Sequence, residues 1–510
     1  MMSKIVPPEA LNFRRALLAM LGLSLTLMLS ALDQTVIGNT MPYIVADLGG
    51  FDWYAWLATG YLLTSIVTVP IFGRLGDYFG RKYFVITATL VFTLASLLCA
   101  QANDMLMLVL WRALQGIGGG MLIGTAFACI PELFPEVRRR LRWQILLSSA
   151  FSVVNALGPT LGGILTEQYG WRSVFYLNVP CGLLALVMAW RYLPYIKPLQ
   201  QHNIQLDWLG ALLVMLLLGS LQLGITGMST HMNELGVIAW VFASLLSFLG
   251  LIGQQKRAAS PLLPPSLFVP STVRQLFILS TLAGAVMFTL LYFAPLLFQG
   301  GYGYSAQQAA WLLTPLGVSI TLGAIINGRI VTRLRNPALL PVSGFLLLAA
   351  ACIGLALCGA RASFVQLLLL MLMCGSGLGF ILLNLTLFTQ TLAPREHLGI
   401  ATALLQSFRL VGGLLGTAAT SLLLNMLYHG LLRQTLGEDA ADRWSDPGKL
   451  LGMVEKTATG EMVFARHALI TAIDASLFIC AVIAMVAAGI TYRLSNIVLV
   501  SPQASRQPTS

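Results

Sequence analysis

Apolar runs of about twenty residues recur along nearly the whole chain and are separated by short polar turns. A helix of that length crosses the ~30 Å hydrocarbon core of a bilayer and satisfies its backbone hydrogen bonds within its own segment. Only 10% of the 510 residues are charged and 57% are hydrophobic, whereas about 25% of residues are charged in soluble domains. The chain is therefore predicted to be an all-α membrane protein.

The apolar runs predict fourteen transmembrane helices. They cover residues 16–38, 55–72, 83–99, 106–129, 143–165, 174–192, 209–227, 235–251, 275–297, 310–330, 339–357, 364–388, 400–427 and 468–491. Turns such as Arg81–Lys82 and Arg138–Arg140 would then be cytoplasmic, while short outer loops carry acids such as Asp52 and Glu167. The positive-inside rule predicts both termini in the cytoplasm, and removing one helix would invert the later loops, so an even number is favoured.

The net charge of +11 does not indicate a nucleic-acid partner, because Lys and Arg lie in short turns rather than on one polar face. All seven cysteines fall inside apolar runs without a Cys-x-x-Cys pair, so neither a disulfide framework nor a metal site is predicted. The partner that the composition does indicate is the lipid bilayer.

A glycine-rich pattern occurs twice. LQGIGGG (114–120) lies fifteen residues before Pro135, and MCGSGLG (373–379) lies fifteen residues before Pro394, 259 residues further along the chain. We therefore predict two pseudo-symmetric six-helix bundles, residues 1–193 and 271–497. Two inserted helices with their linkers (194–270) lie between them, and 498–510 form a disordered cytoplasmic tail. Transporters built from such repeats bind their substrate between the halves.

The outer segment 429–467 is long and carries charges of both signs. It is either a surface loop without function or a gate or partner contact.

Asp33 places a carboxylate inside the first apolar run. A charge at the centre of a membrane costs at least ~2.5–3.5 kcal/mol, so an acid there is a functional candidate. Burial disfavours the charged form of a carboxyl group, and water or a nearby cation favours it. Asp33 could therefore load a proton on one side and release it on the other. The alternative is that it lies near the interface and caps or hydrogen-bonds a neighbouring helix.

Arg112 is a second charge within an apolar run, one helical turn before Gly116. It would also need a partner or a wet cavity. Its counterpart in the second repeat is Met371, so polar residues are concentrated in one half, as expected of a coupling site. The alternative is a structural role in which Arg112 ties loops or helices together.

The stretch GPTLGG (158–163) lies in the fifth predicted helix. Gly158 and Gly162 are one turn apart and allow another helix to approach closely, while Pro159 kinks its own helix. Close and bendable packing is predicted here.

These motifs resemble those of a known family. GRLGDYFGRK (73–82) resembles the cytoplasmic loop signature of the major facilitator superfamily, LWRALQGIGGG (110–120) its fourth-helix motif and GPTLGG its antiporter motif. LDQTVIGNTMP (32–42), WRSVFYLNVP (171–180) and PLLFQ (295–299) followed by GYS (303–305) resemble the fourteen-span drug/proton antiporter branch. The resemblance covers residues 16 to about 493 and implies the major facilitator fold.

The resemblance implies roles for several residues. Asp33 would bind a proton or a cationic substrate, and Arg112 would take part in proton coupling. The antiporter hinge, associated with export, would be formed by Gly158, Pro159, Gly162 and Gly163.

The resemblance also implies an inner gate. Asp77 would brace it, Gly73 and Gly80 would permit a tight turn and Arg81 would pair nearby. The sequence departs from the family at Tyr78, where a basic residue is usual, and the equivalent turn at 328–336 lacks an acid. The inner gate is therefore expected to be weaker or differently braced.

Two further charges lie in the last two predicted helices. Arg409 precedes GGLLG (412–416), a common feature of the family, and Asp474 lies about two turns into the fourteenth helix. Each is a candidate for proton or substrate coupling, with a structural role as the alternative.

The resulting prediction is an exporter in the bacterial cytoplasmic (inner) membrane, driven by the proton gradient without a cofactor. It would move small amphipathic, drug-like compounds outward by alternating access, as in multidrug efflux and antibiotic resistance. Lipophilic cations are favoured, although Arg112 and Arg409 leave neutral or anionic compounds open. A periplasmic adaptor is also left open as a partner.

The sequence leaves two alternative functions. A proton-coupled symporter for a small nutrient is disfavoured by the antiporter motif. A nontransporting sensor or a membrane-bound enzyme is disfavoured because no metal-ligand spacing, nucleophile motif or phosphate loop is found.

Overall fold

The computed structural model describes residues 13–134, 143, 154, 157–196, 207–229, 233–258, 261, 265–268, 270–331, 334, 336–359, 362–392, 398–436, 443–444, 446–450 and 460–494. A few side chains within these ranges, that of Asp77 among them, are not described. The predicted tail at 498–510 lies outside the described residues.

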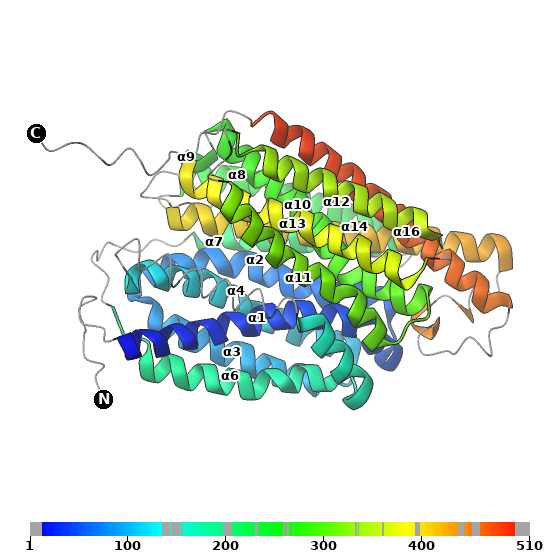
Figure 1. Ribbon diagram of the computed structural model, residues 1–510, viewed down its shortest axis with the longest axis horizontal. Coiled ribbons are helices and arrows are strands. Elements are labelled where there is room, and N and C mark those ends of the chain that lie inside the picture. The colour runs from blue at the N-terminus through cyan, green and yellow to red at the C-terminus, as the bar shows by residue number, and fades with distance from the viewer. Residues whose placement is uncertain are drawn as a thin grey trace, which may run out of the picture.

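The described elements are helices joined by short turns (Figure 1). In chain order they are α1 (Phe13–Leu48), η2 (Phe51–Trp53), α2 (Tyr54–Phe79), α3 (Arg81–Ala100), α4 (Met105–Leu133), α6 (Arg172–Tyr192), α7 (Trp208–Ser229), α8 (Glu234–Arg257), α9 (Pro265–Phe268), α10 (Ser271–Leu296), η3 (Leu297–Gly301), α11 (Ala306–Ile330), α12 (Leu339–Cys358), α13 (Phe364–Leu392), α14 (Leu398–Leu436), η6 (Pro447–Leu450) and α16 (Gly460–Tyr492). Residues 157–169 are also helical. The predicted all-α fold class is confirmed.

Within the described residues, 13 helices are long and apolar enough to cross a membrane. The fifth predicted span, 143–165, lies partly outside the described residues, and its described part belongs to helix 157–169. Several helices extend beyond the predicted ends: α1 reaches Leu48 and α14 reaches Leu436. Hydropathy falls at the membrane surface, but the backbone hydrogen bonds of a helix continue into water, so apolar runs underestimate helix length.

Elements α1 to α6, with helix 157–169, form one group, here called the N-terminal half, and α10 to α16 form the C-terminal half (Figure 1). The repeated glycines have the same task in both halves, because each lets two helices pack backbone against backbone. A Cβ added to these glycines would meet the facing helix as follows: Gly116 at Tyr61, Gly120 at Ser65, Gly375 at Leu316 and Gly379 at Ile320. The sequence repeat is therefore a packing repeat. The proposed domain boundaries themselves stay predictions.

The inserted helices α7 and α8 pack against each other, and α7 also packs against α2 of one half and α14 of the other. The Trp56 indole N–H donates to the hydroxyl of Thr226 over 2.9 Å, which fixes α7 to α2. The outer helix α8 exposes a row of large apolar side chains, including Leu235, Ile238 and Phe242. An apolar row of this kind suits lipid rather than water.

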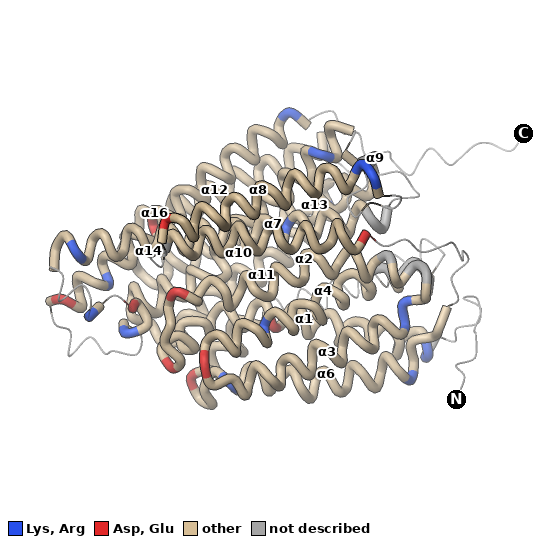
Figure 2. Tube along the Cα trace, turned by 180° about the vertical axis from the view of Figure 1, so that it is seen from behind, with Lys and Arg blue, Asp and Glu red and all other residues tan. Residues whose placement is uncertain are grey.

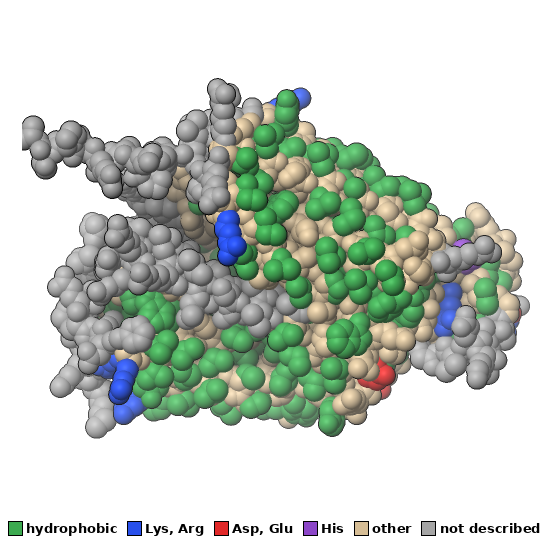
Figure 3. Space-filling view, viewed as in Figure 1, with side chains coloured by type: hydrophobic (Ala, Val, Ile, Leu, Met, Phe, Trp, Pro, Cys, Tyr) green, Lys and Arg blue, Asp and Glu red, His purple; other side chains and the backbone are tan. Residues whose placement is uncertain are grey.

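Charges gather at the two ends of the bundle (Figure 2). The end where α2 stops at Phe79, here called the turn end, carries mainly Lys and Arg. The opposite end, where α1 stops at Leu48 and η6 lies, is called the loop end and carries most of the Asp and Glu. Between the ends, apolar side chains cover much of the visible face (Figure 3). The chain is a multi-pass membrane protein.

The described residues between α14 and α16, which are 443–444 and 446–450, lie at the loop end. Tyr428 donates its hydroxyl hydrogen to the carbonyl of Trp444 over 2.8 Å, and Arg443 forms an ion pair of 3.1 Å with Glu461. The turn η6 packs against both α1 and α16, and its Leu450 is fully buried. This part of the predicted outer loop therefore bridges the two halves.

Candidate functional site

Asp33 on α1 and Arg112 on α4 form an ion pair inside the N-terminal half. The Nη1 atom of Arg112 lies 2.5 Å from Oδ2 of Asp33, and both side chains have 0% exposure. The carboxylate thus faces another helix's side chain rather than a helix end at the interface. Because both charges are removed from water, deleting either one would leave the other uncompensated, a loss of about 3–5 kcal/mol.

Neutral amides complete the shell of the ion pair. Gln115, three residues after Arg112 on the same face of α4, accepts from Arg112 Nη1 at 2.7 Å and donates to Asp33 Oδ1 at 2.9 Å. Asn178 on α6 donates to Asp33 Oδ1 over 3.4 Å and to the Ser96 hydroxyl over 3.0 Å. Side chains from α3, α4 and α6 therefore position the carboxylate of Asp33, which lies on α1.

Two further groups fix the guanidinium of Arg112. Its Nε donates to the carbonyl of Leu57 on α2 over 3.1 Å, and its Cζ lies 4.8 Å from the ring centre of Tyr61. The Tyr61 hydroxyl in turn lies 3.0 Å from the Ser30 hydroxyl on α1. Arg112 is therefore positioned by backbone, by an aromatic face and by charge.

Tyr292 reaches this site from α10 of the C-terminal half. Its side chain is fully buried and lies close enough to Arg112 and Asp33 to interact electrostatically with both. In the part of the chain that the structure describes, the Tyr292 hydroxyl, Arg112 Nη2 and Asn178 Oδ1 have no hydrogen-bond partner. Buried polar groups without partners are uncommon and destabilise a protein by about 1–3 kcal/mol each.

The halves meet in a seam at the loop end. Asn39 on α1 donates to the carbonyl of Ala306 over 3.0 Å and accepts, through Oδ1, a hydrogen bond of 3.1 Å from Gln299. Nearby, a Cβ at Gly38 would overlap the carbonyl of Leu291, so only glycine allows α1 and α10 to approach this closely. The seam is closed at this end.

Glu167 adds a charge to the same seam. Its carboxylate accepts from the backbone N–H of Gln307 at 3.0 Å and from the Ser305 hydroxyl at 3.2 Å, at the amino end of α11. An anion is stabilised at a helix amino terminus by the unpaired N–H groups and the helix dipole. The carboxylate of one half thus caps a helix of the other.

The predicted hinge glycines lie on helix 157–169 beside α1. A Cβ at Gly158 would overlap Thr35, and one at Gly162 would lie 2.8 Å from Val36 Cγ1. Gly163 faces the other half, where a Cβ would lie 2.5 Å from that of Ala310. The buried Pro159 stands between these contacts. The motif therefore packs against α1 within a turn of Asp33 and also forms part of the seam.

The predicted inner-gate residues lie at the turn end. Gly80 joins α2 to α3 with φ 83°, and a Cβ there would lie 2.8 Å from the Tyr195 ring. Gly73 lies inside α2, facing the carbonyl of Gly124, rather than in the turn. Arg81 is the first residue of α3, and the side chain of Asp77 lies outside the described atoms. The brace attributed to Asp77 stays a prediction.

Arg409 and Asp474 lie apart from each other in the C-terminal half. Arg409 is on α14, where its backbone carbonyl packs against Gly284 of α10. Asp474 on α16 is half-buried near Tyr302 and Cys358, on both of which its charge acts. Burial first, and then the charge of Asp474, raises the pKa of Tyr302. The structure brings neither residue into the hydrogen-bonded set around Asp33.

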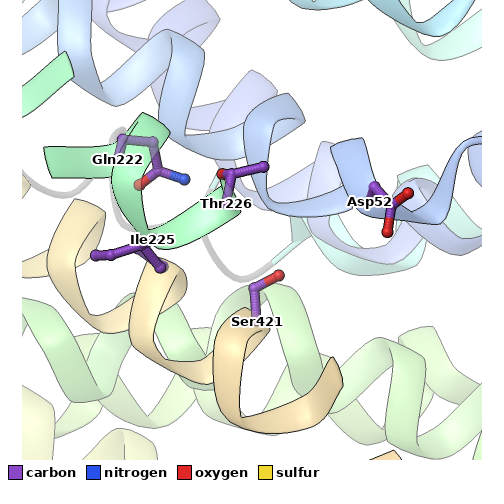
Figure 4. Close-up of a pocket in the computed structure, with 6 residues that line it drawn as sticks. Asp52, Gln222, Ile225, Thr226 and Ser421 are labelled. Carbon is purple, nitrogen blue, oxygen red and sulfur yellow. The ribbon is translucent and has the colours of Figure 1, made fainter. Parts of the chain in front are cut away.

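A crevice opens where α7 meets both halves (Figure 4). The crevice is too narrow to enclose a water molecule, and it is lined by Asp52, Gln222, Ile225, Thr226, Ala418 and Ser421. Gln222 is buried there, and its Oε1 has no partner among the described atoms.

Sequence reasoning missed the amides and tyrosines of the site. Gln115 could have been found from its spacing, because residues three apart on a helix share a face. Asn178 and Gln299 lie inside motifs that the resemblance already marked. Tyr292 carried no such signal, because one tyrosine in an apolar run does not reveal which half it faces.

Two helical halves with a buried ion pair beside their seam define the architecture of a secondary transporter. The model of the Major Facilitator Superfamily matches residues 23–417, and the chain belongs to this family. The family resemblance of the sequence motifs is confirmed.

Relatives of similar length are named as drug transporters. Multidrug transporter protein MdtP of Bacillus subtilis is 30% identical over 457 residues, which cover 89% of this chain and 84% of that protein. Multidrug resistance protein 3 of the same organism is 31% identical over 494 residues, covering 92% of this chain and 93% of the relative. The chain is thus a transporter of the Major Facilitator Superfamily with multidrug transporters among its relatives.

Solved structures show the same fold. A bacterial homologue of the human lysosomal transporter Spinster, in an inward-facing and unoccupied conformation, superposes with a TM-score of 0.69 at 16% identity over 96% of this chain and all of the other. A D-xylose-proton symporter superposes with a TM-score of 0.57 at 16% identity, covering 86% of this chain and 95% of that one. At such identities the comparison concerns the fold alone.

Proposed function

We propose that the protein is a proton-coupled antiporter that exports amphipathic drug-like compounds, lipophilic cations above all, across the cytoplasmic membrane of a bacterium. The observation that carries the proposal is the fully buried ion pair between Asp33 and Arg112 beside the seam of the two halves. The bacterial relatives named as multidrug transporters support the class of substrate and the membrane.

Charge explains why a proton and a cation would compete for this site. The ion pair is neutral overall, so either a proton on Asp33 or a bound cation raises the charge of the site to +1, and both together would raise it to +2. Two positive charges in a dry interior repel strongly. Each ligand therefore weakens the binding of the other by the same factor, which is the coupling an antiporter needs.

Alternating access supplies the direction of transport. In this structure the seam is closed at the loop end, which faces outward if the basic turn end is cytoplasmic. Rocking of the halves about the glycines of helix 157–169 would open the loop end and close the turn end. Each proton that then enters yields ~2.3 kcal/mol per 100 mV of membrane potential. The proton gradient is the energy source, and no cofactor takes part.

The test is proton release from purified protein in weakly buffered detergent on adding tetraphenylphosphonium, a lipophilic cation. Wild-type protein is expected to release protons, and Asp33→Asn is expected to release none, because the amide cannot carry an exchangeable proton in the same role. Glu234→Gln, at an exposed carboxylate of α8, is the matched control and should behave as wild type.

Everted vesicles distinguish the alternatives. Antiport predicts that tetraphenylphosphonium added to energised vesicles causes proton leak through the wild-type protein. A nutrient symporter would instead couple proton entry to substrate uptake, and a sensor would give no proton movement with any compound. Proton release that persists in Asp33→Asn would contradict the mechanism.

A further inference from the structure

Three buried polar atoms on residues that form the ion pair, contact it or interact with it electrostatically make no hydrogen bond to any described residue. They are Nη2 of Arg112, Oδ1 of Asn178 and the hydroxyl of Tyr292. Two belong to the N-terminal half, and the third comes from the C-terminal half. In the ion-paired state the site therefore has a spare donor on the cation, a spare acceptor on an amide that touches Asp33, and a phenol hydroxyl able to accept.

The position of Tyr292 depends on closure of the seam. Its backbone carbonyl accepts a hydrogen bond of 2.7 Å from the Tyr54 hydroxyl of the other half. Gly38 of α1 packs against the preceding residue, Leu291. The Tyr292 ring also stacks on Phe288 of its own helix, with centres 5.8 Å apart. When the halves separate at the loop end, the contacts of this part of α10 with Tyr54 and Gly38 would break, and the Tyr292 hydroxyl would move away from Arg112 with α10.

We propose that Tyr292 is the cross-half positioning residue of proton coupling: its hydroxyl accepts from Arg112 Nη2 when Asp33 is protonated. This inference rests on the proposed function and adds to it the group that links the proton to the movement of the halves. Arg112 would exchange its bond to the carboxylate for a bond to α10.

The hydrogen bonds around Asp33 rearrange on the addition of one proton and need no other reactant. A proton from water adds to a carboxylate oxygen of Asp33, whose new O–H donates to Oδ1 of Asn178. The ion pair becomes a neutral acid beside a guanidinium, so Arg112 loses part of its attraction to Asp33. Its Nη2 then donates to the Tyr292 oxygen. All three atoms that lack partners in the ion-paired state gain one in the protonated state.

Four of the elements around Asp33 present a titratable group that bears on this step. Arg112 comes from α4, Tyr61 from α2, Cys99 from α3 and Tyr292 from α10. Of these four, Tyr292 alone comes from the C-terminal half, so it is the one whose distance from Asp33 changes when the halves rock. Proton loading thereby favours the state that is closed at the loop end.

The first test is the proton-release experiment on the full chain carrying Tyr292→Phe. We expect tetraphenylphosphonium binding to stay within about threefold, and the midpoint of proton release to move down by about one pH unit, a tenfold loss of proton affinity. Tyr54→Phe is the control for a merely structural role, because it loosens the same seam but leaves the Tyr292 hydroxyl in place. Its midpoint should move less than that of Tyr292→Phe.

The outcomes separate the two proposals. If wild-type protein releases no protons, the proposed function fails whatever Tyr292 does. If wild type releases protons and Asp33→Asn does not, but Tyr292→Phe keeps the wild-type midpoint, this inference alone is overturned. An equal shift in Tyr54→Phe would also overturn it.

A second measurement does not depend on transport. Asp33→Asn imitates the neutral side chain of the protonated state, so Arg112 should already contact Tyr292 in that variant. Tyr292→Phe is then expected to lower the melting temperature more in the Asp33→Asn background than in wild type. Equal losses in both backgrounds would contradict the proposed contact.

Discussion

Single buried residues decide what the N-terminal half can do. Asp33 and Arg112 are conspicuous in the sequence because charges are rare in apolar runs. The sequence does not show that the two residues form an ion pair. Pairing depends on how α1 and α4 cross, and no local pattern encodes that crossing. The Asn178 contact, which joins positions 145 residues apart, could not be predicted for the same reason.

At this scale we predict that Gln115→Ala destabilises the protein by about 1–3 kcal/mol, the range for a buried polar group left without its partner. Gln115 both accepts from Arg112 and donates to Asp33, so its loss leaves each charge short of one hydrogen bond. Unfolding in detergent measures the effect. Gln101→Ala, at an exposed position that ends α3, serves as the control, and equal stability of the two variants would count against the bridging role of Gln115.

Helices and turns were predictable to different degrees. The apolar runs predicted nearly every described helix, because hydropathy reports burial in lipid directly. They did not predict the extensions of α1 and α14, where stability comes from packing at the loop end rather than from lipid. The glycine motifs predicted close packing, but not that Gly163 faces the other half. A small residue indicates a close helix contact but not which helix makes it.

At the scale of elements we predict that Gly163→Ala opens the loop end. The added methyl group would lie 2.5 Å from Ala310 Cβ and 2.7 Å from the carbonyl of Ala306, so helix 157–169 and α11 must separate. Spin labels at the exposed Tyr169 and Trp311, one on each half, should show a longer distance in the variant. Leu161→Ala, at an exposed position of the same helix, should not, and an unchanged distance in Gly163→Ala would refute the assignment.

In the whole molecule the two halves are joined by more than the membrane helices. The short segment at 446–450 belongs to the C-terminal half, yet Gly448 packs near Val45 of α1. Burial raises the pKa of Asp446 and the neighbouring charge of Asp52 adds to the rise, against the lowering effects of the Gly448 N–H and Lys449. The sequence showed a charged outer loop but not this contact with α1, because a charged surface pattern does not reveal tertiary contacts.

A raised pKa gives the sign of a pH effect. The folded state holds the Asp446 proton more tightly than the unfolded state, so the contribution of this group to stability falls as pH rises from about 4, the ordinary value for Asp, through the raised pKa. We therefore predict that Asp446→Asn, which keeps an acceptor for the Gly448 N–H, raises the melting temperature at pH 7.5.

Near pH 4 the difference between Asp446→Asn and wild type should become small, because the carboxyl group is then largely neutral in the folded state and about half neutral in the unfolded state. Melting curves at the two pH values give the comparison, with Glu234→Gln as the exposed control. A lower melting temperature for Asp446→Asn at pH 7.5 would mean that the charged form is stabilising and that the sign is reversed.

The position of α7 makes the two flanks of the transporter unequal. It packs across α2 and α14, whereas on the opposite flank helix 157–169 meets α11 directly, with Thr160 hydrogen-bonded to Thr314. A lipophilic compound arriving from the bilayer would therefore meet different helices on the two flanks, α7 on one and helix 157–169 with α11 on the other.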